Sequence, residues 1–213
     1  MNIDNQHEYW DRVAQEKTFS HPVDTQRLST YISPEALIVD FGCGYGRVIN
    51  DLQLAGYQHV KGFDTSMQLV QRGKSAGLPL QHIPTPADVP LANNSVDCIL
   101  LFAVLTCIPS NKGQAELLYL LNSKLKPGGI LYISDYYLQR NEAAKKRYTY
   151  FNGAADNFGV FSLPEGVMFR HHTRAWIKTL LKAFDLKEEH IIPTRTMNGN
   201  AAEAFQLIAQ KPL

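Results

Sequence analysis

Short apolar runs alternate with stretches of helical periodicity along most of the chain. Residues 36–41 (ALIVDF) form a run typical of a strand buried on both faces, and from Tyr45 onward the apolar residues recur with the period of a helix. The same alternation is repeated farther on, with strands expected at HVKGF, LPLQHI, VDCILLFAV and ILYIS and helices at 66–76 and 173–184. Between these two helices, another helix is expected to carry Ala115, Leu118, Leu121 and Leu125 and to end at 126–129.

Two further strand candidates close the chain, LKEEHII and AEAFQLIAQ. No helix separates them, so they are expected to pair as an antiparallel hairpin, whereas strands joined by helices pair in parallel through right-handed crossovers. The pattern therefore predicts an α/β protein with a mostly parallel, doubly wound sheet that contains one antiparallel strand near the C-terminus.

The length of 213 residues suits a single domain with a sizeable core. We expect one domain over residues 1–213, with an N-terminal helix at 5–18. Residues 140–160 are irregular in pattern, are rich in Asn, Ala, Lys and Tyr, and lie between two core elements. We interpret them as an inserted lid.

Charge and cysteine content narrow the class of protein. Lys and Arg total 21 against 20 Asp and Glu, which argues against a nucleic-acid partner, and the basic run 145–147 is interpreted as a solvated face. Three cysteines without CxxC spacing favour a reducing, cytoplasmic location. The N-terminal segment is polar, so no signal peptide is expected. No apolar run is long enough to span a membrane, so no membrane partner is expected. The sequence contains no set of His, Asp and Glu at metal-ligand spacing, so no metal site is expected.

The segment VDFGCGYGR (39–47) places a strand, a tight glycine turn and the start of a helix in immediate succession. Gly42 and Gly44 allow the backbone to turn sharply and a ligand to approach it, and the helix start offers free N–H groups. A nicotinamide-binding loop would carry its third glycine at position 47, where this sequence has Arg47.

Two carboxylates accompany this loop. Asp40 ends the strand before the glycines, where it would repel a pyrophosphate and attract an ammonium group. Asp64 ends the next strand, about 20 residues after the glycines, where such folds place a carboxylate for ribose hydroxyls. The alternative is that the glycines form only a turn and Asp64 only a helix cap. The joint occurrence of all these features favours a cofactor that brings an ammonium group and no phosphate.

Together with VPLANNSVDCILLFAVLTCI and LKPGGILYIS, these motifs make the chain resemble a class I S-adenosylmethionine-dependent methyltransferase of the small bacterial type. The resemblance runs from EYWDRVA to the C-terminus. It implies a Rossmann-like doubly wound sheet of seven strands, layered αβα, with a final antiparallel strand. It also implies S-adenosyl-L-methionine as cofactor and S-adenosyl-L-homocysteine as product.

Carried over onto this sequence, the resemblance implies which residues hold the cofactor. Asp40 would bind the methionine amino group, Asp64 the ribose hydroxyls, and Phe102 would lie beside the sulfonium. Pro86 stands where the family often has an alanine, and since proline has no N–H, Ala87 would have to serve the adenine ring. The full set is Trp10, Asp40, Gly42, Cys43, Gly44, Asp64, Thr65, Met67, Thr85, Pro86, Ala87 and Phe102.

Two members of this set have a purely structural alternative. Trp10 shares an apolar stripe with Tyr9 and Val13, which is equally explained as the face that docks the N-terminal helix. Cys43 is explained as a small side chain that packs in the glycine turn.

The acceptor is expected over the carboxyl ends of the strands, beside the glycine loop. Tyr136, which follows the fifth strand, and Arg170 are the candidate substrate ligands. His171 and His172 are candidate general bases, of which at most one faces the pocket because consecutive residues of an extended segment point to opposite faces.

We therefore predict an enzyme that transfers a methyl group to an O, N or S atom of a small molecule, as a monomer or homodimer. One alternative is a methyltransferase acting on RNA or protein; the near-neutral charge argues against it, as does FAVL in place of an Asn/Asp-Pro-Pro-Tyr/Phe tetrapeptide. The other alternative is a non-catalytic protein that binds S-adenosylmethionine, which only a turnover measurement distinguishes.

Overall fold

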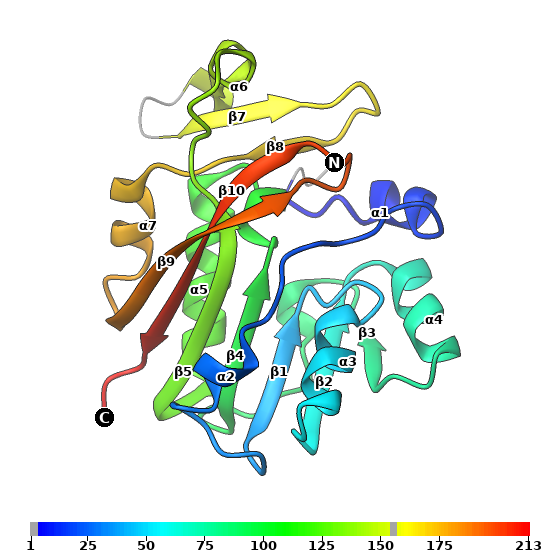
Figure 1. Cartoon of the computed structure of the whole chain (residues 1–213), viewed down its shortest axis with the longest axis vertical. Helices are drawn as coiled ribbons and strands as arrows, with labels where there is room; N and C mark the ends of the chain where they lie inside the picture. Colours follow the sequence, from blue (N-terminus) through cyan, green and yellow to red (C-terminus); the bar gives the residue numbers. More distant parts are fainter. Residues whose placement is uncertain (1–3, 154–156) are drawn as a thin grey trace.

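The computed structural model describes residues 4–153 and 157–213. Its centre is a seven-stranded sheet in the order β3-β2-β1-β4-β5-β10-β9 (Figure 1), in which β10 runs antiparallel to both its neighbours and the other pairs are parallel. This order confirms the predicted fold class, including the C-terminal hairpin. The strands are β1 (Leu37–Phe41), β2 (His59–Asp64), β3 (Leu80–His82), β4 (Val96–Phe102), β5 (Leu125–Tyr136), β9 (Asp185–Arg195) and β10 (Ala201–Gln210).

Helices cover both faces of this sheet, because alternate residues of its strands turn to opposite sides. Val39 and Ile99 belong to the core cluster that includes side chains of the helices on one face, whereas Ile38 and Leu100 belong to the cluster on the other. Both faces are therefore buried, which explains the continuous apolar runs of the strands. The helices of the first face are α5 (Asn111–Lys124) and α7 (Arg174–Leu180), and those of the second are α2 (Thr25–Leu28), α3 (Arg47–Leu54) and α4 (Met67–Ser75).

The helix that was predicted to carry Ala115, Leu118, Leu121 and Leu125 is α5, and Leu125 lies beyond its end. Ser110 caps α5 by accepting a hydrogen bond from the Gly113 N–H, and the helix ends at Lys124 because Leu125 turns to an extended backbone (ψ 139°) and begins β5. Its buried face consists of Gln114, Leu117, Leu118 and Leu121, so that the predicted face, which included Ala115, is partly wrong.

The N-terminal helix is shorter than the predicted 5–18. Helix α1 covers His7–Val13, and the chain then turns, with the N–H groups of Glu16 and Lys17 both donating to the Val13 carbonyl. Beyond the helix, the Arg72 guanidinium donates to the backbone oxygens of residues 14 and 17. This contact holds the chain against α4 just beyond the helix.

The described residues of the connection between β5 and α7 form a helix and a small sheet where the sequence pattern suggested an irregular segment. It extends to Arg170, beyond the predicted 140–160, and residues 154–156 lie outside the described residues. Its aromatic side chains, among them Tyr148 and Phe161, share a core cluster with Tyr9 and Val13 of α1. It comprises α6 (Glu142–Arg147), the 3-10 turn η3 (Phe151–Gly153) and an antiparallel sheet of β6 (Thr149–Tyr150), β7 (Phe158–Ser162) and β8 (Met168–Arg170).

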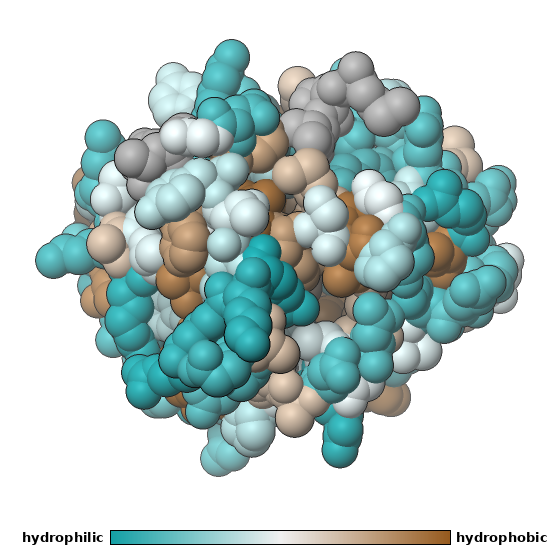
Figure 2. Space-filling model, turned by 90° about the horizontal axis from the view of Figure 1, so that it is seen from above, coloured by the Kyte–Doolittle hydropathy of each residue, from teal (hydrophilic) through white to brown (hydrophobic). Residues whose placement is uncertain are grey.

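This insertion and α1 lie at the same end of the molecule, above the carboxyl ends of the parallel strands (Figure 1). Seen from that end, apolar side chains are visible in hollows between largely hydrophilic rims (Figure 2). None of the helices within 4–153 and 157–213 is long and apolar enough to cross a membrane.

Candidate active site

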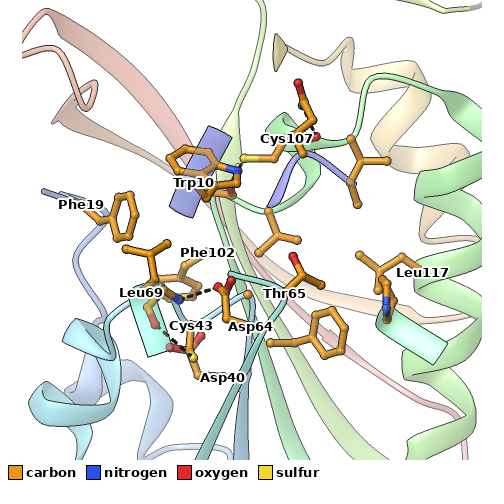
Figure 3. A pocket seen from close by; sticks show the side chains of 18 of the residues that line it. Trp10, Phe19, Asp40, Cys43, Asp64, Thr65, Leu69, Phe102, Cys107 and Leu117 are labelled. Atoms are coloured by element: carbon orange, nitrogen blue, oxygen red, sulfur yellow. Dashed lines mark hydrogen bonds between the residues drawn. The ribbon is translucent and has the colours of Figure 1, made fainter. Parts of the chain in front are cut away.

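A cavity lies at the carboxyl ends of β1, β2 and β4, beside the glycine turn (Figure 3). Trp10 lies across it from Asp40 and Cys43. It brings together most of the residues that the resemblance implied for the cofactor. Those that line it are Trp10, Asp40, Gly42, Cys43, Gly44, Asp64, Thr65, Pro86 and Phe102.

The glycine turn requires its glycines. Gly42 (φ +74°) and Gly44 (φ +55°) have left-handed backbone conformations, and a Cβ atom on Gly44 would lie 2.5 Å from the Phe19 ring. The Gly44 N–H donates to Asp64 Oδ2 at 2.7 Å, which ties the turn after β1 to the end of β2. The turn is therefore fixed between a carboxylate and an aromatic ring.

Asp64 has two structural hydrogen bonds and further acceptor capacity. Its second oxygen, Oδ1, accepts from the Ser66 N–H at 2.7 Å. Burial raises the pKa of Asp64, and the two backbone hydrogen bonds act in the opposite direction. Because each carboxylate oxygen carries two lone pairs, Asp64 can hold the turn and still accept hydroxyl groups from a ligand in the cavity.

Asp40 is buried and incompletely hydrogen-bonded. It is 2% exposed, and its Oδ2 has no hydrogen-bond partner. Burial raises the pKa of Asp40 to about 7, although nearby Arg47 lowers it. Arg47 itself donates to Asp51 Oδ2 at 3.1 Å and to the backbone oxygen of His21. A buried carboxylate oxygen that lines a cavity without a partner is unfavourable unless a ligand supplies a donor or a positive charge.

The end of β4 has a strained backbone. Ala103 has φ +56°, a conformation that non-glycine residues rarely adopt. Its N–H donates to the Ser134 carbonyl at 2.7 Å, and the Cys107 thiol donates to its carbonyl at 3.2 Å. Such strain persists only where the surrounding structure holds it, and it is common beside binding sites.

Three of the implied cofactor residues lie outside this cavity. Met67, on the first turn of α4, is 41% exposed, and Ala87 is also exposed. The Thr85 hydroxyl donates to Asp88 at 2.8 Å and so stabilises the 3-10 turn η1 (Pro86–Asp88). The positions of Met67, Thr85 and Ala87 do not support their predicted contacts with the adenosine. Thr85 is hydrogen-bonded within the turn, and of this turn only Pro86 lines the cavity.

A second cavity of about 510 Å³ lies between the end of β5, the insertion and the turn that joins β9 to β10. This volume is typical of small-molecule sites. Tyr136 and His171 line it, as the acceptor prediction placed them. It shares four residues with the first cavity, so that the two cavities adjoin; these residues are Trp10, Phe19, His21 and Ala103.

Arg170 lines neither cavity, and its position does not support the predicted role as a substrate ligand. The residue is 1% exposed, and its guanidinium donates to Asn157 Oδ1 at 2.5 Å and to Asn111 Oδ1 at 2.6 Å. Its place before α7 suggested a position at the binding edge of the sheet, but the side chain instead ties β8 of the insertion to the N-terminus of α5.

His171 and His172 point to different surroundings. The His171 Nδ1 atom lies 2.7 Å from the Tyr148 hydroxyl, and its ring lines the second cavity. His172 lines neither of the two cavities, because its nitrogens lie 3.0 Å from Gln114 Nε2 and 3.0 Å from the Tyr136 carbonyl. Burial lowers the pKa of both histidines, so both are neutral at pH 7.

Sequence reasoning missed two residues that both cavities share. Phe19 and His21 come from the segment that joins α1 to α2, which has no regular structure. The local sequence FSHP carries no motif or periodicity, so nothing short of the folded chain indicates that this segment crosses the site.

Three features of the mostly parallel sheet together define the class I methyltransferase fold. They are the glycine turn after β1, the carboxylate at the end of β2 and the antiparallel strand β10 beside β5. The sequence profile of the methyltransferase domain family matches residues 15–191, and the chain belongs to this family. The family resemblance inferred from the glycine turn and its carboxylates is thereby confirmed.

Individual relatives agree with this assignment. O-methyltransferase 3 of Dictyostelium discoideum is 29% identical over 186 residues, which cover 78% of this chain and 42% of that protein. The chain thus spans less than half the length of this relative.

Solved structures with low sequence identity share the fold. A SAM-dependent methyltransferase from Methanosarcina mazei superposes with a TM-score of 0.79 at 23% identity, over 88% of this chain and 97% of that one. The 1,6-didemethyltoxoflavin-N1-methyltransferase of Burkholderia thailandensis, solved with 1,6-didemethyltoxoflavin and S-adenosylhomocysteine, has a TM-score of 0.63 at 13% identity, over 98% and 80% of the two chains.

Proposed function

We propose that this protein transfers a methyl group from S-adenosylmethionine to a small-molecule acceptor. The observation that carries the proposal is the pair of adjoining cavities, one built on the glycine turn and the other under the insertion. A methyl donor in the first cavity and an acceptor in the second would meet at the four residues that the cavities share.

The residues of the first cavity fit this donor. Asp40 Oδ2, buried and without a partner, would accept the methionine ammonium group, and Asp64 would accept the ribose hydroxyls. S-adenosylmethionine carries no phosphate, which the two carboxylates would repel. Bound there, it supplies a methyl group on a positively charged sulfur.

The chain's own contribution is positioning and exclusion of water. Methyl transfer is an in-line displacement whose leaving group needs no proton, so alignment of the two reactants supplies much of the rate. Trp10 and Phe19 form part of the boundary between the cavities, and the insertion covers the second one. The proposed role of the insertion is that of a lid, which keeps water from the reacting atoms.

A small-molecule acceptor is favoured over RNA or protein. The second cavity has the volume of a small-molecule site, and the Burkholderia thailandensis neighbour was solved with bound 1,6-didemethyltoxoflavin. Three unpaired cysteines support the further proposal of a cytoplasmic location.

The proposal is tested by turnover. The protein is incubated with S-adenosylmethionine and either a library of small nucleophiles, total RNA or a denatured protein extract, and S-adenosylhomocysteine is measured. We expect product only with members of the small-molecule library. Product with RNA or protein alone would support a macromolecular acceptor, and cofactor binding without any turnover would support the non-catalytic alternative.

The pKa of Asp40 predicts a pH-dependent affinity. Because the pKa of the buried carboxyl is about 7, the unliganded protein holds a proton there below pH 7, and an ammonium group must displace it. The affinity for S-adenosylhomocysteine should therefore rise by up to about tenfold per pH unit from about pH 5 to 7, and level off above. Calorimetry in buffers of different ionisation enthalpy measures both the affinity and the released proton.

Two variants separate Asp40 from other groups in this pH range. Asp40→Asn should bind more weakly and lose the dependence. Asp135→Asn should keep it, although burial also raises the pKa of Asp135 to about 7, because Asp135 lines neither cavity. A wild-type affinity that does not vary between pH 5.5 and 7.5 would contradict the assignment of Asp40.

A further inference from the structure

His21 occupies the boundary between the two cavities. Its side chain is 4% exposed, and its Nδ1 atom lies 2.8 Å from the Ser134 hydroxyl on β5. The Arg47 guanidinium donates to its backbone oxygen, which fixes the chain at this point independently of the imidazole. The ring is therefore oriented by the Ser134 hydroxyl and the backbone by Arg47.

The other ring nitrogen of His21 has no partner. Nε2 is buried and makes no hydrogen bond. In the described part of the chain, it is the single buried side-chain nitrogen or oxygen without a partner among the residues that line the second cavity. Two neighbouring groups already have partners: His171 Nδ1 pairs with Tyr148, and the Tyr136 hydroxyl donates to the Arg195 carbonyl at 3.4 Å. A buried polar atom in this state indicates a missing ligand group.

Ring side chains form part of the wall of the second cavity. The Tyr136 ring is stacked with the His171 ring, with centroids 5.0 Å apart and planes 30° apart, and it meets the His21 ring edge-on at 4.7 Å. Phe161 and Phe169 add two more rings from the insertion. Flat ring faces of this kind favour a planar ligand, because they bury area and stack at low entropic cost.

We propose that the second cavity binds a planar aromatic acceptor that carries a hydroxyl group, and that His21 Nε2 forms a hydrogen bond with that hydroxyl. The inference rests on the proposed methyl-transfer function and adds the acceptor class and a residue that contacts the reacting atom. Ser134 is a positioning residue, because it acts on the acceptor only through the His21 ring.

The proposed step balances as follows. A lone pair of the acceptor oxygen forms a bond to the methyl carbon, and the carbon–sulfur bond breaks with its electron pair remaining on sulfur, which becomes a neutral thioether. As the oxygen gains the methyl group, its proton becomes strongly acidic and passes to His21 Nε2, from which it reaches water when the product leaves. Burial, with a contribution from Arg47, lowers the pKa of His21 to about 4, so the resting ring is neutral and Nε2 can accept the hydrogen bond of the hydroxyl.

The test uses 2-naphthol and naphthalene as probes, which differ only in the hydroxyl group. Binding of each to the full chain saturated with S-adenosylhomocysteine is measured by ligand-observed NMR. We expect wild-type protein to prefer 2-naphthol by about tenfold or more, since a buried donor or acceptor left unpaired is costly.

Two substitutions of His21 dissect this preference. In His21→Gln the side-chain amide reaches the position of Nε2, so the preference should be largely retained. In His21→Asn the amide reaches only the position of Nδ1, so the ratio of the two affinities should fall at least about fivefold. His190→Gln, on the exposed part of β9, is the control and should leave the ratio unchanged.

Binding of S-adenosylhomocysteine is measured on every variant, so that failure of the cofactor assignment is distinguished from failure of this proposal. The proposal is overturned if wild-type protein binds S-adenosylhomocysteine but neither probe, or binds both probes equally. It is also overturned if folded His21→Asn protein keeps the wild-type preference.

Discussion

Replacement of Gly44 by valine is expected to reduce the affinity for S-adenosylhomocysteine by about a hundredfold or more. Gly44 has φ +55°, which a β-branched residue does not adopt without strain, and a Cβ atom would lie 2.5 Å from the Phe19 ring at the cavity wall. The side chain would therefore either fill the cofactor space or force the turn open. Calorimetry on folded protein measures the loss.

Gly56→Ala provides a matched control. Gly56 also has a positive φ of +95°, but nothing lies within 4 Å of the position its Cβ would take, and it follows the far end of α3. Alanine there should reduce stability through backbone strain and leave the affinity nearly unchanged. Equal effects of the two substitutions on affinity would mean that the glycine turn only connects β1 to α3.

Asp64→Ala is expected to weaken binding of S-adenosylhomocysteine by about 2–3 kcal/mol, roughly 30- to 150-fold, because charge-assisted hydrogen bonds to the ribose are lost. The same substitution removes the acceptor of the Gly44 N–H, so the turn also loosens. Titration calorimetry measures the affinity, and thermal unfolding of the unliganded protein measures the second effect.

A second aspartate supplies the control for this experiment. Asp88 likewise accepts a backbone hydrogen bond, from the Thr85 N–H at 3.0 Å, but it is exposed and lines neither cavity. Asp88→Ala should therefore change the affinity little. An unchanged affinity in folded Asp64→Ala protein would mean that Asp64 is a structural cap and holds no ligand.

The features that the sequence predicted are local ones. The buried strand, the glycines and Asp40 lie within 36–47, and the hairpin of β9 and β10 follows from the lack of a helix between two apolar runs. Periodicity and turn chemistry act over a few residues, so such features can be inferred without knowledge of the tertiary structure.

The features that it did not predict depend on contacts between distant parts of the chain. Arg170 pairs with Asn111, 59 residues away, and the hydrogen bond between His21 and Ser134 spans 113 residues. Arg72 of α4 likewise binds the backbone beyond α1, at residues 55 and 58 positions away along the chain. In each case the position of the side chain depends on a contact with a distant part of the chain, and no local sequence pattern indicates that contact.

The most direct test of the central claim is calorimetric titration of the purified protein with S-adenosylhomocysteine and, separately, with NAD. Asp40 is buried and its Oδ2 has no partner, which predicts binding of S-adenosylhomocysteine in the micromolar range, about −8 kcal/mol. Arg47 stands in place of the glycine that a pyrophosphate would require, which predicts no binding of NAD. Binding of NAD without binding of S-adenosylhomocysteine would contradict the account.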